Sequence, residues 1–541
     1  MTSEHQRRDR GWLAGSREDA LARLRTDREP WDLIVIGGGI TGAGVLREAS
    51  RRGLRALLVE ARDFAWGTSS RSSKMVHGGL RYLGAGHFAL TRDAVVERER
   101  LLAEAPGLVE RMQYLMPHYR HKLPGRHAMG ALLWAYDRFA GQRTRDFHPP
   151  TQAQQWLPGL RLEGLKGCSR FSDAVTDDAR LVLRVLTEAL SDGALAVNYL
   201  RATEIVSDNG RVAGVRLLDE ISGERFDAHA SVVVSATGAW TDRLREQMGQ
   251  AAVIRPLRGS HLVVPAWRLP VSCSLTLMHP DDRRPLFIFP WEGTTVIGTT
   301  DLDHTDSIDE EARISDAEID YLLAAVRHVF PSAELSRADI RSSWSGVRPI
   351  VRGNAKTPSK ESREHVVWDD QGLISVAGGK LTTFRLIALD VLNAAAPYLS
   401  QQPQRPEDER IFAATPALPR PPGMRTRVWQ RLQGHYGRDL PALLARAEGL
   451  APIDGTRTVR AELAWAAANE SVLHLDDLLL RRTRLGLLLD NGGEDFLPEI
   501  RQICQPLLGW NDDRWQQEVT RYRAIWQRHY SIPGRAATAS T

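Results

Sequence analysis

Short apolar runs that end near glycines recur along this chain. Residues 32–36 read DLIVI, a β-branched run that predicts a buried parallel strand. A helical pattern follows over residues 43–53, and Ala56–Val59 predicts a second strand. Two later strands, Ser231–Ser235 and residues 373–377, also run into glycines. The pattern therefore predicts strand-to-glycine junctions at three widely separated places.

The first junction has the spacing of a dinucleotide-binding turn. Gly37, Gly39 and Gly42 fit G-x-G-x-x-G, and Glu60 follows the second strand, 18 residues past Gly42. The three glycines allow, in turn, a tight turn, a close approach of backbone to pyrophosphate, and packing of helix on strand. Glu60 suits the hydroxyls of an unphosphorylated adenosine ribose. This order of elements favours a bound dinucleotide over a glycine-rich turn without a ligand.

The sequence distance between the junctions indicates which dinucleotide the chain binds. The three junctions spread over about 340 residues, which suits a long cofactor held at several points. We therefore expect FAD rather than NAD, which one compact domain usually binds. Beyond a proline-rich segment at 403–422 the pattern is helical, and its longest helical stretches are Ala461–Asn469, Leu475–Leu489 and Arg514–His529.

Composition excludes several classes of protein. The chain has 541 residues, of which 42% are hydrophobic and 26% charged, as in ordinary globular proteins. No apolar run approaches the roughly 20 residues of a spanning helix, and the N-terminal residues lack the apolar core of a secretory signal. A net charge of +4 does not favour nucleic acid as a partner. Cys168, Cys273 and Cys504 are too far apart for a local disulfide framework or a metal motif, which favours a reducing cytoplasmic setting but leaves distant pairing open.

Residues 68–83, TSSRSSKMVHGGLRYL, resemble the signature of the FAD-dependent (aerobic) glycerol-3-phosphate dehydrogenases. Further segments resemble the same family in the same order, and together they cover roughly residues 30–530. They are ATGAW at 236–240, RGSHLVVP at 258–265, FIFPW at 287–291, IGTTD at 297–301, SGVRP at 345–349, GGKLTTF at 378–384 and DDLLLRRTRLG at 476–486.

The resemblance implies a fold and an activity. The fold is α/β, an FAD-binding Rossmann-like domain of the glutathione-reductase and D-amino-acid-oxidase type with a mixed α+β substrate cap and a C-terminal all-α domain. Residues 1–30 would be an N-terminal extension, 30–402 the FAD-binding domain with the cap interleaved at about 111–170 and 251–354, and 403–541 the helical domain. The activity is oxidation of sn-glycerol 3-phosphate to dihydroxyacetone phosphate, with hydride passing from C2 to FAD N5 and electrons to a membrane quinone.

The fingerprint and the resemblance together give the expected FAD contacts, and no metal site is expected. The expected contacts are Gly37, Gly38, Gly39, Ile40, Thr41, Gly42, Glu60, Thr68, Ser69, Ser70, Ser73, Lys74, Gly78, Gly79, Leu80, Thr237, Gly238, Gly379, Lys380, Leu381 and Thr382.

Alcohol oxidation needs a base for the hydroxyl proton and cations for the phosphate. His261 is the candidate base, with an orienting or buried histidine as the alternative. The resemblance places Arg348 beside the flavin, and His77 is weighed between a structural role and a contact with flavin or substrate. The further candidates for binding substrate are Arg81, Tyr82, Arg363 and Lys380. Lys380 alternatively serves the flavin N1–C2=O region.

A basic, aromatic segment suggests contact with an anionic membrane. Residues 118–146 carry six lysines and arginines against two aspartates, around an apolar stretch that contains Met129, Leu132, Leu133, Trp134 and Tyr136. The alternative is an ordinary cap helix packed on the core. By resemblance the protein attaches peripherally to the inner face of the cell membrane, and a homodimer is one expected assembly. Three other functions stay open: a glycerol-3-phosphate oxidase that uses oxygen, an amine oxidase of the same superfamily, and a non-catalytic or RNA-associated flavoprotein.

Overall fold

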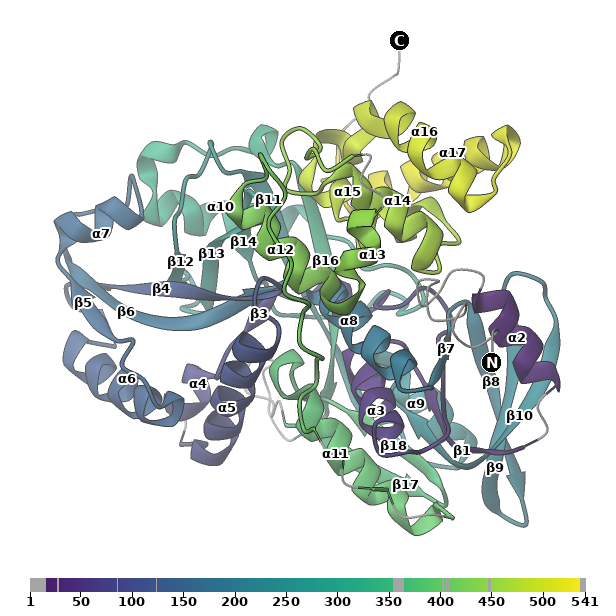
Figure 1. The fold of residues 1–541 in the computed structure, drawn as a ribbon. Helices are drawn as coiled ribbons and strands as arrows, with labels where there is room; N and C mark the ends of the chain where they lie inside the picture. Colours follow the sequence, from purple (N-terminus) through teal and green to yellow (C-terminus); the bar gives the residue numbers. More distant parts are fainter. Residues whose placement is uncertain are drawn as a thin grey trace.

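Two large sheets and a helical C-terminal region make up the protein (Figure 1). The computed structural model describes residues 16–26, 29–84, 86–122, 124–353, 364–400, 403–404, 406, 408–445 and 449–535, without the side chains of Ser16 and Arg81. The expected fold class is confirmed, because a parallel-stranded core sheet with its crossover helix adjoins a mixed sheet and an all-helical region. The division into domains stays a prediction.

The first sheet is built around β1 (Trp31–Ile36). β1 lies parallel between β2 (Ala56–Val59) and β10 (Arg225–Ser235), as expected for a strand buried on both faces. The other strands are β17 (Val366–Asp370) and β18 (Leu373–Ala377) beyond β10, β7 (Leu195–Val197) beyond β2, and the ribbon β8 (Leu200–Asp208) and β9 (Arg211–Asp219). The carboxyl ends of β1, β10 and β18 therefore meet at one edge.

The second sheet is mixed and includes the strands expected for the cap. β11 (Ile254–Pro265) pairs with β14 (Thr294–Gly298), β15 (Leu302–Asp303) and β16 (Ser342–Val351). The sheet continues through β13 (Pro285–Trp291), β12 (Ser274–Met278), β4 (Val109–Tyr119) and β6 (Leu165–Thr176), with β3 (Met75–Val76) and β5 (Asp146–His148) on β6. β11, β13 and β14 lie within residues 251–354, which the resemblance assigns to the cap.

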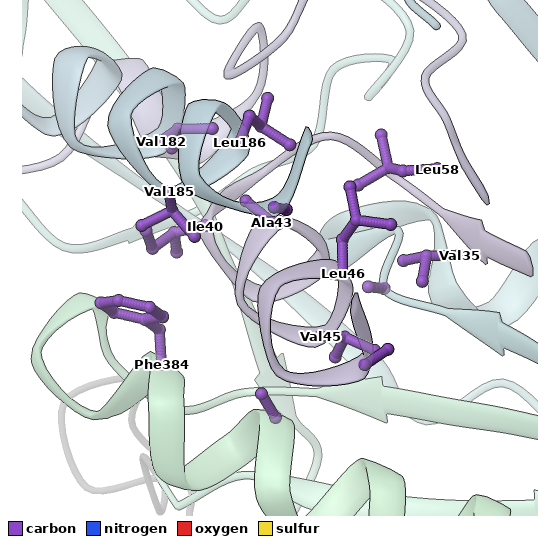
Figure 2. Close-up of a cluster of buried hydrophobic side chains, with 14 of the residues drawn as sticks. Val35, Ile40, Ala43, Val45, Leu46, Leu58, Val182, Val185, Leu186 and Phe384 are labelled. Atoms are coloured by element: carbon purple, nitrogen blue, oxygen red, sulfur yellow. The ribbon is translucent and has the colours of Figure 1, made fainter. Parts of the chain in front are cut away.

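Three helices form the apolar layer behind the first sheet. α3 (Ile40–Ser50) lies between α8 (Asp178–Ser191) and α11 (Phe384–Ala395), and Figure 2 shows their interlocking side chains. The ring of Phe384 packs against the backbone of Gly44, where a Cβ would lie 2.8 Å from it. Each large side chain buried here contributes roughly 1.5–3 kcal/mol of hydrophobic stabilisation.

The remaining helices cover the two sheets and build the C-terminal region. They are α2 (Ser16–Thr26), α4 (Leu80–Gly84), α5 (Phe88–Glu104), α6 (Arg126–Ala140), α7 (Pro150–Trp156), α9 (Thr241–Gln247), α10 (Asp316–Val329), α12 (Thr426–Tyr436), α13 (Leu440–Ala445), α14 (Arg460–Asn469), α15 (Leu485–Leu488), α16 (Leu497–Leu508) and α17 (Asp512–His529). The short 3₁₀ helices are Thr68–Ser70, Gly238–Trp240, Pro331–Ala333, Arg337–Asp339, Leu381–Thr383, Ala396–Tyr398, Gly437–Asp439 and Asp490–Phe496.

The N-terminal extension includes a docked helix. Leu21 and Leu24 of α2 are buried in the cluster formed around β8, β9 and β10. Arg17 of α2 donates hydrogen bonds to the carbonyl oxygens of Asn198 and Tyr199 and pairs with Asp219. Residues 16–26 are thus part of the packed structure.

The predicted helix at Leu475–Leu489 is interrupted. Asp477–Arg482 forms a π-helix, Arg484 adopts a left-handed backbone conformation (φ 62°), and only Leu485–Leu488 is α-helical. The guanidinium of Arg484 is turned inward, where it donates to the carbonyl of Leu480 and pairs with aspartates of another segment. The need to pair buried arginines outweighs the helical pattern here.

The apolar stretch of α6 mostly faces the protein. Met129, Leu133 and Tyr136 are buried, and Trp134 alone among these four is exposed, at 56%. Three of the five large residues of this stretch therefore pack in the core, and Leu132 is half-buried, as in the alternative of a cap helix. Contact of α6 with a membrane stays a prediction. No helix of the described residues has the length and apolar character needed to cross a bilayer. The three cysteines are buried free thiols.

Candidate active site

A cavity of about 300 Å³ lies where the carboxyl ends of β1, β10 and β18 meet, the usual ligand site of a doubly wound sheet. Twelve of the expected FAD contacts line it. They are Gly37, Gly39, Ile40, Thr41, Glu60, Thr68, Ser69, Thr237, Gly238, Gly379, Lys380 and Leu381. Segments from four separate parts of the chain therefore converge on one site.

The glycine turn is closed by contacts that leave no space for side chains. Gly37 has φ +113°, and a Cβ there would lie 2.6 Å from the carbonyl oxygen of Ala236. A Cβ on Gly42 would lie 1.9 Å from the carbonyl oxygen of Gly37, so α3 packs directly on the turn. Gly39 is the N-cap residue of α3 and has no side chain to cap it, which leaves the positive end of the helix for an anionic group.

Glu60 joins the turn to the second strand. Its carboxylate accepts hydrogen bonds from Gly38 N (2.6 Å) and Arg62 N (2.8 Å). Burial raises the pKa of Glu60, and these two backbone N–H groups partly oppose that rise. The acid is therefore held rigidly at the cavity, where a ribose hydroxyl is expected.

The hydroxyl-rich loop after Glu60 closes the cavity from another side. Ser69 Oγ accepts a hydrogen bond from Ile40 N (3.0 Å), and Thr68 Oγ1 donates one to the carbonyl of Val347 (2.5 Å). Ser72, which was not among the predicted contacts, also lines the cavity. The donors, the uncapped helix and the glycine cradle together suit the pyrophosphate of a dinucleotide.

Lys380 follows β18 and lines the same cavity as the glycine turn after β1. Its ammonium lies 3.6 Å from the ring centroid of Tyr82, and a Cβ on Gly79 would be 3.4 Å from its Nζ. Gly378 and Gly379 have φ values near +80°, which brings the backbone close to the cavity before Leu381 starts a short helix. Two predicted substrate ligands, Tyr82 and Lys380, are thus in contact.

His261 is almost fully buried on β11. Its Nε2 lies 2.9 Å from Ser73 Oγ, its ring stacks on Trp344 at 4.8 Å between centroids, and Nδ1 has no hydrogen-bond partner among the described residues. Burial lowers the pKa of His261 well below its ordinary value, and the nearby Arg348 and Lys74 cations lower it further. The imidazole is therefore neutral near pH 7, as a proton acceptor must be.

Arg348 lies on β16, directly beside β11. Its guanidinium lies against Gly259, where a Cβ would come within 2.4 Å of it, and it donates to Thr299 Oγ1 (3.2 Å) and pairs with Asp301 (3.3 Å). Gly259 and His261 are two residues apart on one strand, so they share a face of the sheet. Pro349, the next residue, lines the cavity.

Nine predicted FAD contacts do not line the cavity. They are Gly38, Gly42, Ser70, Ser73, Lys74, Gly78, Gly79, Leu80 and Thr382. Among them, Lys74 has a fully buried ammonium that binds Asp178 (2.9 Å) and lies over the rings of Trp291 and Trp344. An ion pair in the interior holds this side chain away from the cavity.

Two other predicted residues, His77 and Gly78, form hydrogen bonds through their backbone. The N–H and carbonyl of His77 both bond to Thr382 Oγ1 at 3.2 Å, which joins the segment after β3 to the helix after Lys380. The N–H of Gly78 donates to Asp173 (3.0 Å). Arg363 and the side chain of Arg81 lie outside the described part of the chain.

Sequence reasoning missed several residues at the end of the cavity beside Glu60, where the adenosine is expected. Arg62, Arg201 and Arg243 line this end together with Trp240 and Asp309. Asp309 accepts hydrogen bonds from Trp240 Nε1 (3.0 Å) and Arg243 (2.5 Å). Trp240 lies in the ATGAW motif. No sequence pattern around Asp309 identifies it as a cavity residue, because only the fold brings Asp309 to the cavity.

Comparisons with known proteins agree with this geometry. A family model described as FAD dependent oxidoreductase matches residues 32–386, and one described as the C-terminal domain of alpha-glycerophosphate oxidase matches residues 390–515. Glycerol-3-phosphate dehydrogenase 2 of Mycobacterium bovis is 35% identical, over 95% of this chain and 92% of its own length.

Solved structures extend the likeness to three dimensions. The glycerol-3-phosphate dehydrogenase of Bacillus halodurans, solved with FAD, is similar with a TM-score of 0.76 and 26% identity, over 97% of this chain and 100% of that one. The L-α-glycerophosphate oxidase of Mycoplasma pneumoniae, also solved with FAD, shares the fold with a TM-score of 0.57 and 17% identity, over 72% of this chain and 100% of that one. The chain binds FAD as its cofactor and belongs to the family of FAD-dependent glycerol-3-phosphate dehydrogenases and oxidases.

Proposed function

We propose that this protein oxidises sn-glycerol 3-phosphate to dihydroxyacetone phosphate and passes the electrons to a membrane quinone. The observation that carries the proposal is the pairing of a neutral, deeply buried histidine, His261, with the cation Arg348 on adjacent strands beside the cofactor cavity. The match to relatives named glycerol-3-phosphate dehydrogenase over most of the chain supports the choice of substrate.

Different residues accept the hydroxyl proton of the substrate and bind its phosphate. Bound FAD supplies the acceptor for the hydride that leaves C2. His261 takes the hydroxyl proton of C2, directly or through the hydroxyl of Ser73, which its Nε2 already contacts at 2.9 Å. Arg348 and Lys380 hold the phosphate, because guanidinium and ammonium groups form charge-assisted hydrogen bonds to its oxygens.

The first test follows the colour of the bound flavin. Anaerobic addition of sn-glycerol 3-phosphate should bleach the flavin band, whereas glycerol, sarcosine and a D-amino acid should not. Bleaching by sarcosine or the D-amino acid would instead support an amine oxidase, which the cations Arg348 and Lys380 disfavour. No bleaching by any of these compounds would overturn the assigned substrate.

The second test concerns the electron acceptor. The expected result is rapid turnover with a soluble quinone analogue and little hydrogen peroxide in air. An equal yield of peroxide with and without the quinone would support the oxidase, the alternative that the M. pneumoniae structure and the family name of residues 390–515 keep open.

Peripheral attachment to an anionic membrane belongs to the same proposal. Phe88 on α5 and Trp134 on α6 are more than half exposed, and Arg138 lies one helical turn from Trp134 on the exposed face of α6. We expect the protein to sediment with vesicles that contain phosphatidylglycerol and to be released by high salt. Equal binding of Trp134→Ser and the unaltered protein would exclude this surface.

A further inference from the structure

The loop that carries Ser72 and Ser73 is held by one carboxylate. Asp178 is the first residue of α8, and its Oδ2 accepts hydrogen bonds from Ser72 N (2.9 Å) and Ser72 Oγ (2.7 Å). Its Oδ1 accepts from Lys74 Nζ (2.9 Å). Ser72 lines the cofactor cavity, and Ser73 contacts His261. The orientation of both serines therefore depends on where Asp178 is held.

Arg484 reaches the same carboxylate from the C-terminal region. Its guanidinium pairs with Asp178, bonds to Asp177 through Nε (3.0 Å), and donates from Nη1 to the carbonyl of Ser70 (3.2 Å). The side chain is buried, and its left-handed backbone follows directly on the π-helix that breaks the predicted helical run. A local distortion thus delivers one guanidinium to a loop 414 residues away in sequence.

Lys74 completes the arrangement. Its ammonium donates to the carbonyl of Ser70 (3.1 Å) as well as to Asp178, so Lys74 and Arg484 share both acceptors. Burial and the neighbouring Arg484 lower the pKa of Lys74 to about 8. Two cations and one carboxylate therefore fix both ends of the segment from Ser70 to Lys74.

We propose that Arg484 is a positioning residue for substrate oxidation: it fixes Asp178 and the Ser70 carbonyl, and through them the Ser72–Ser73 segment and the Ser73–His261 contact. This inference rests on the proposed function for its reaction and assigns a role in it to the C-terminal region. Arg484 touches neither the cavity nor His261, so it acts only through the loop.

The test compares two conservative changes two residues apart in the chain. Arg484→Lys keeps a positive charge but replaces the planar fork, whose Nε, Nη1 and Nη2 reach Asp177, Ser70 and Asp178 from separate positions, with one compact ammonium. Arg482→Lys is the matched control, because Arg482 is equally buried and bonds a carboxylate, but its partner is Asp63, which does not line the cavity. Both variants are purified with FAD, and their melting temperatures are measured first.

The expected result is a change in rate that does not follow stability. Flavin reduction by sn-glycerol 3-phosphate should be about 10- to 100-fold slower in Arg484→Lys, with the substrate concentration at half-maximal rate within threefold of the unaltered protein. Arg482→Lys should reduce its flavin within twofold of the unaltered rate despite a similar fall in melting temperature. Equal slowing of both variants, or of neither, would overturn the positioning role.

Two further measurements test the positioning role if Arg484→Lys does not fold or if the proposed substrate is wrong. If Arg484→Lys does not fold, Asp177→Asn, which weakens the Nε contact and keeps an oxygen to accept the hydrogen bond of Arg180 N that caps α8, should still slow flavin reduction by about threefold, and an unchanged rate would reject the proposal. If the unaltered protein is not reduced by sn-glycerol 3-phosphate, the proposed function fails by itself. The visible spectrum of bound FAD then decides: a band shift in Arg484→Lys that is absent from Arg482→Lys supports positioning, and identical spectra reject it.

Discussion

Both carboxylate oxygens of Glu60 accept hydrogen bonds from backbone N–H groups, those of Gly38 and of the cavity residue Arg62. Glu60→Gln would turn an amide NH₂ toward one of these donors and remove the charge. Because hydrogen bonds to charged groups contribute about 1.5–3 kcal/mol, we expect the dissociation constant of FAD to rise at least about tenfold.

Titration of the apoprotein with FAD, followed by flavin fluorescence, checks this expectation. Glu310→Gln is the control, since the pair of Glu310 with Arg528 is solvent-exposed and outside the cavity. Identical FAD affinities for the two variants would show that Glu60 does not support the cofactor.

Two buried histidines link stability to pH. Burial lowers the pKa of His261 and of His435 well below the ordinary value, and neighbouring cations lower both further. Below pH 6.5 the unfolded chain therefore binds protons that the folded chain does not, so the free energy of unfolding falls as pH falls. Each histidine should cost about 1.4 kcal/mol at pH 5.5 and nothing above pH 7.5.

Urea unfolding at pH 7.5 and pH 5.5 isolates one of these contributions. In His435→Gln the loss of stability between the two pH values should be smaller than in the unaltered protein by about 1.4 kcal/mol. An equal loss in both proteins would mean that His435 is not neutral in the fold.

At the scale of elements, the turn between β1 and α3 tolerates no side chain at Gly42. A Cβ there would lie 1.9 Å from the carbonyl oxygen of Gly37, which is backbone and cannot rotate away. Gly42→Ala should therefore cost about 1–3 kcal/mol or more and reduce bound FAD.

A second helical glycine provides the comparison. A Cβ on Gly130 of α6 meets no atom within 4 Å, so Gly130→Ala should leave stability unchanged or raise it by up to about 1 kcal/mol. Melting temperature and the ratio of flavin to protein absorbance measure both variants. Similar behaviour of the two would contradict the close packing of α3 on the turn.

At the scale of the whole molecule, buried ion pairs join the C-terminal region to the FAD-binding part. Asp63, three residues after Glu60, accepts hydrogen bonds from both Arg481 and Arg482 of the π-helix, and all three side chains are almost fully buried. Asp63→Asn would leave the guanidinium of Arg482 facing an uncharged amide, while Arg481 keeps its pairs with Asp476 and Asp477, at a cost of about 3–5 kcal/mol.

Calorimetry should show this loss as a large fall in melting temperature. Glu494→Gln is the control, because its pair with Arg523 is partly exposed and contributes at most about 1 kcal/mol. A fall no greater than that of the control would show that the buried pair does not hold the two regions together.

Local rules account for what the sequence predicted. The limits of β2 and β18 and the roles of Gly37 and Gly42 follow from apolar runs and from backbone space at a turn, which depend on neighbouring residues only. FAD followed from the spread of three such turns, and the family from motifs. The ion pair of Lys74 was not predicted, because its partner Asp178 is 104 residues away and no local pattern pairs them.

The sequence by itself therefore determined the fold class, the cofactor and twelve of the residues that line its cavity. Tertiary structure decided the rest: it placed Asp309 at the cavity, buried the apolar face of α6, and broke the predicted helix at Arg484. The physical reason is that a buried charged side chain adopts the conformation that brings it to a partner of opposite charge. For Asp178 and Arg484 that partner lies 306 residues away, and only the folded chain brings the two together.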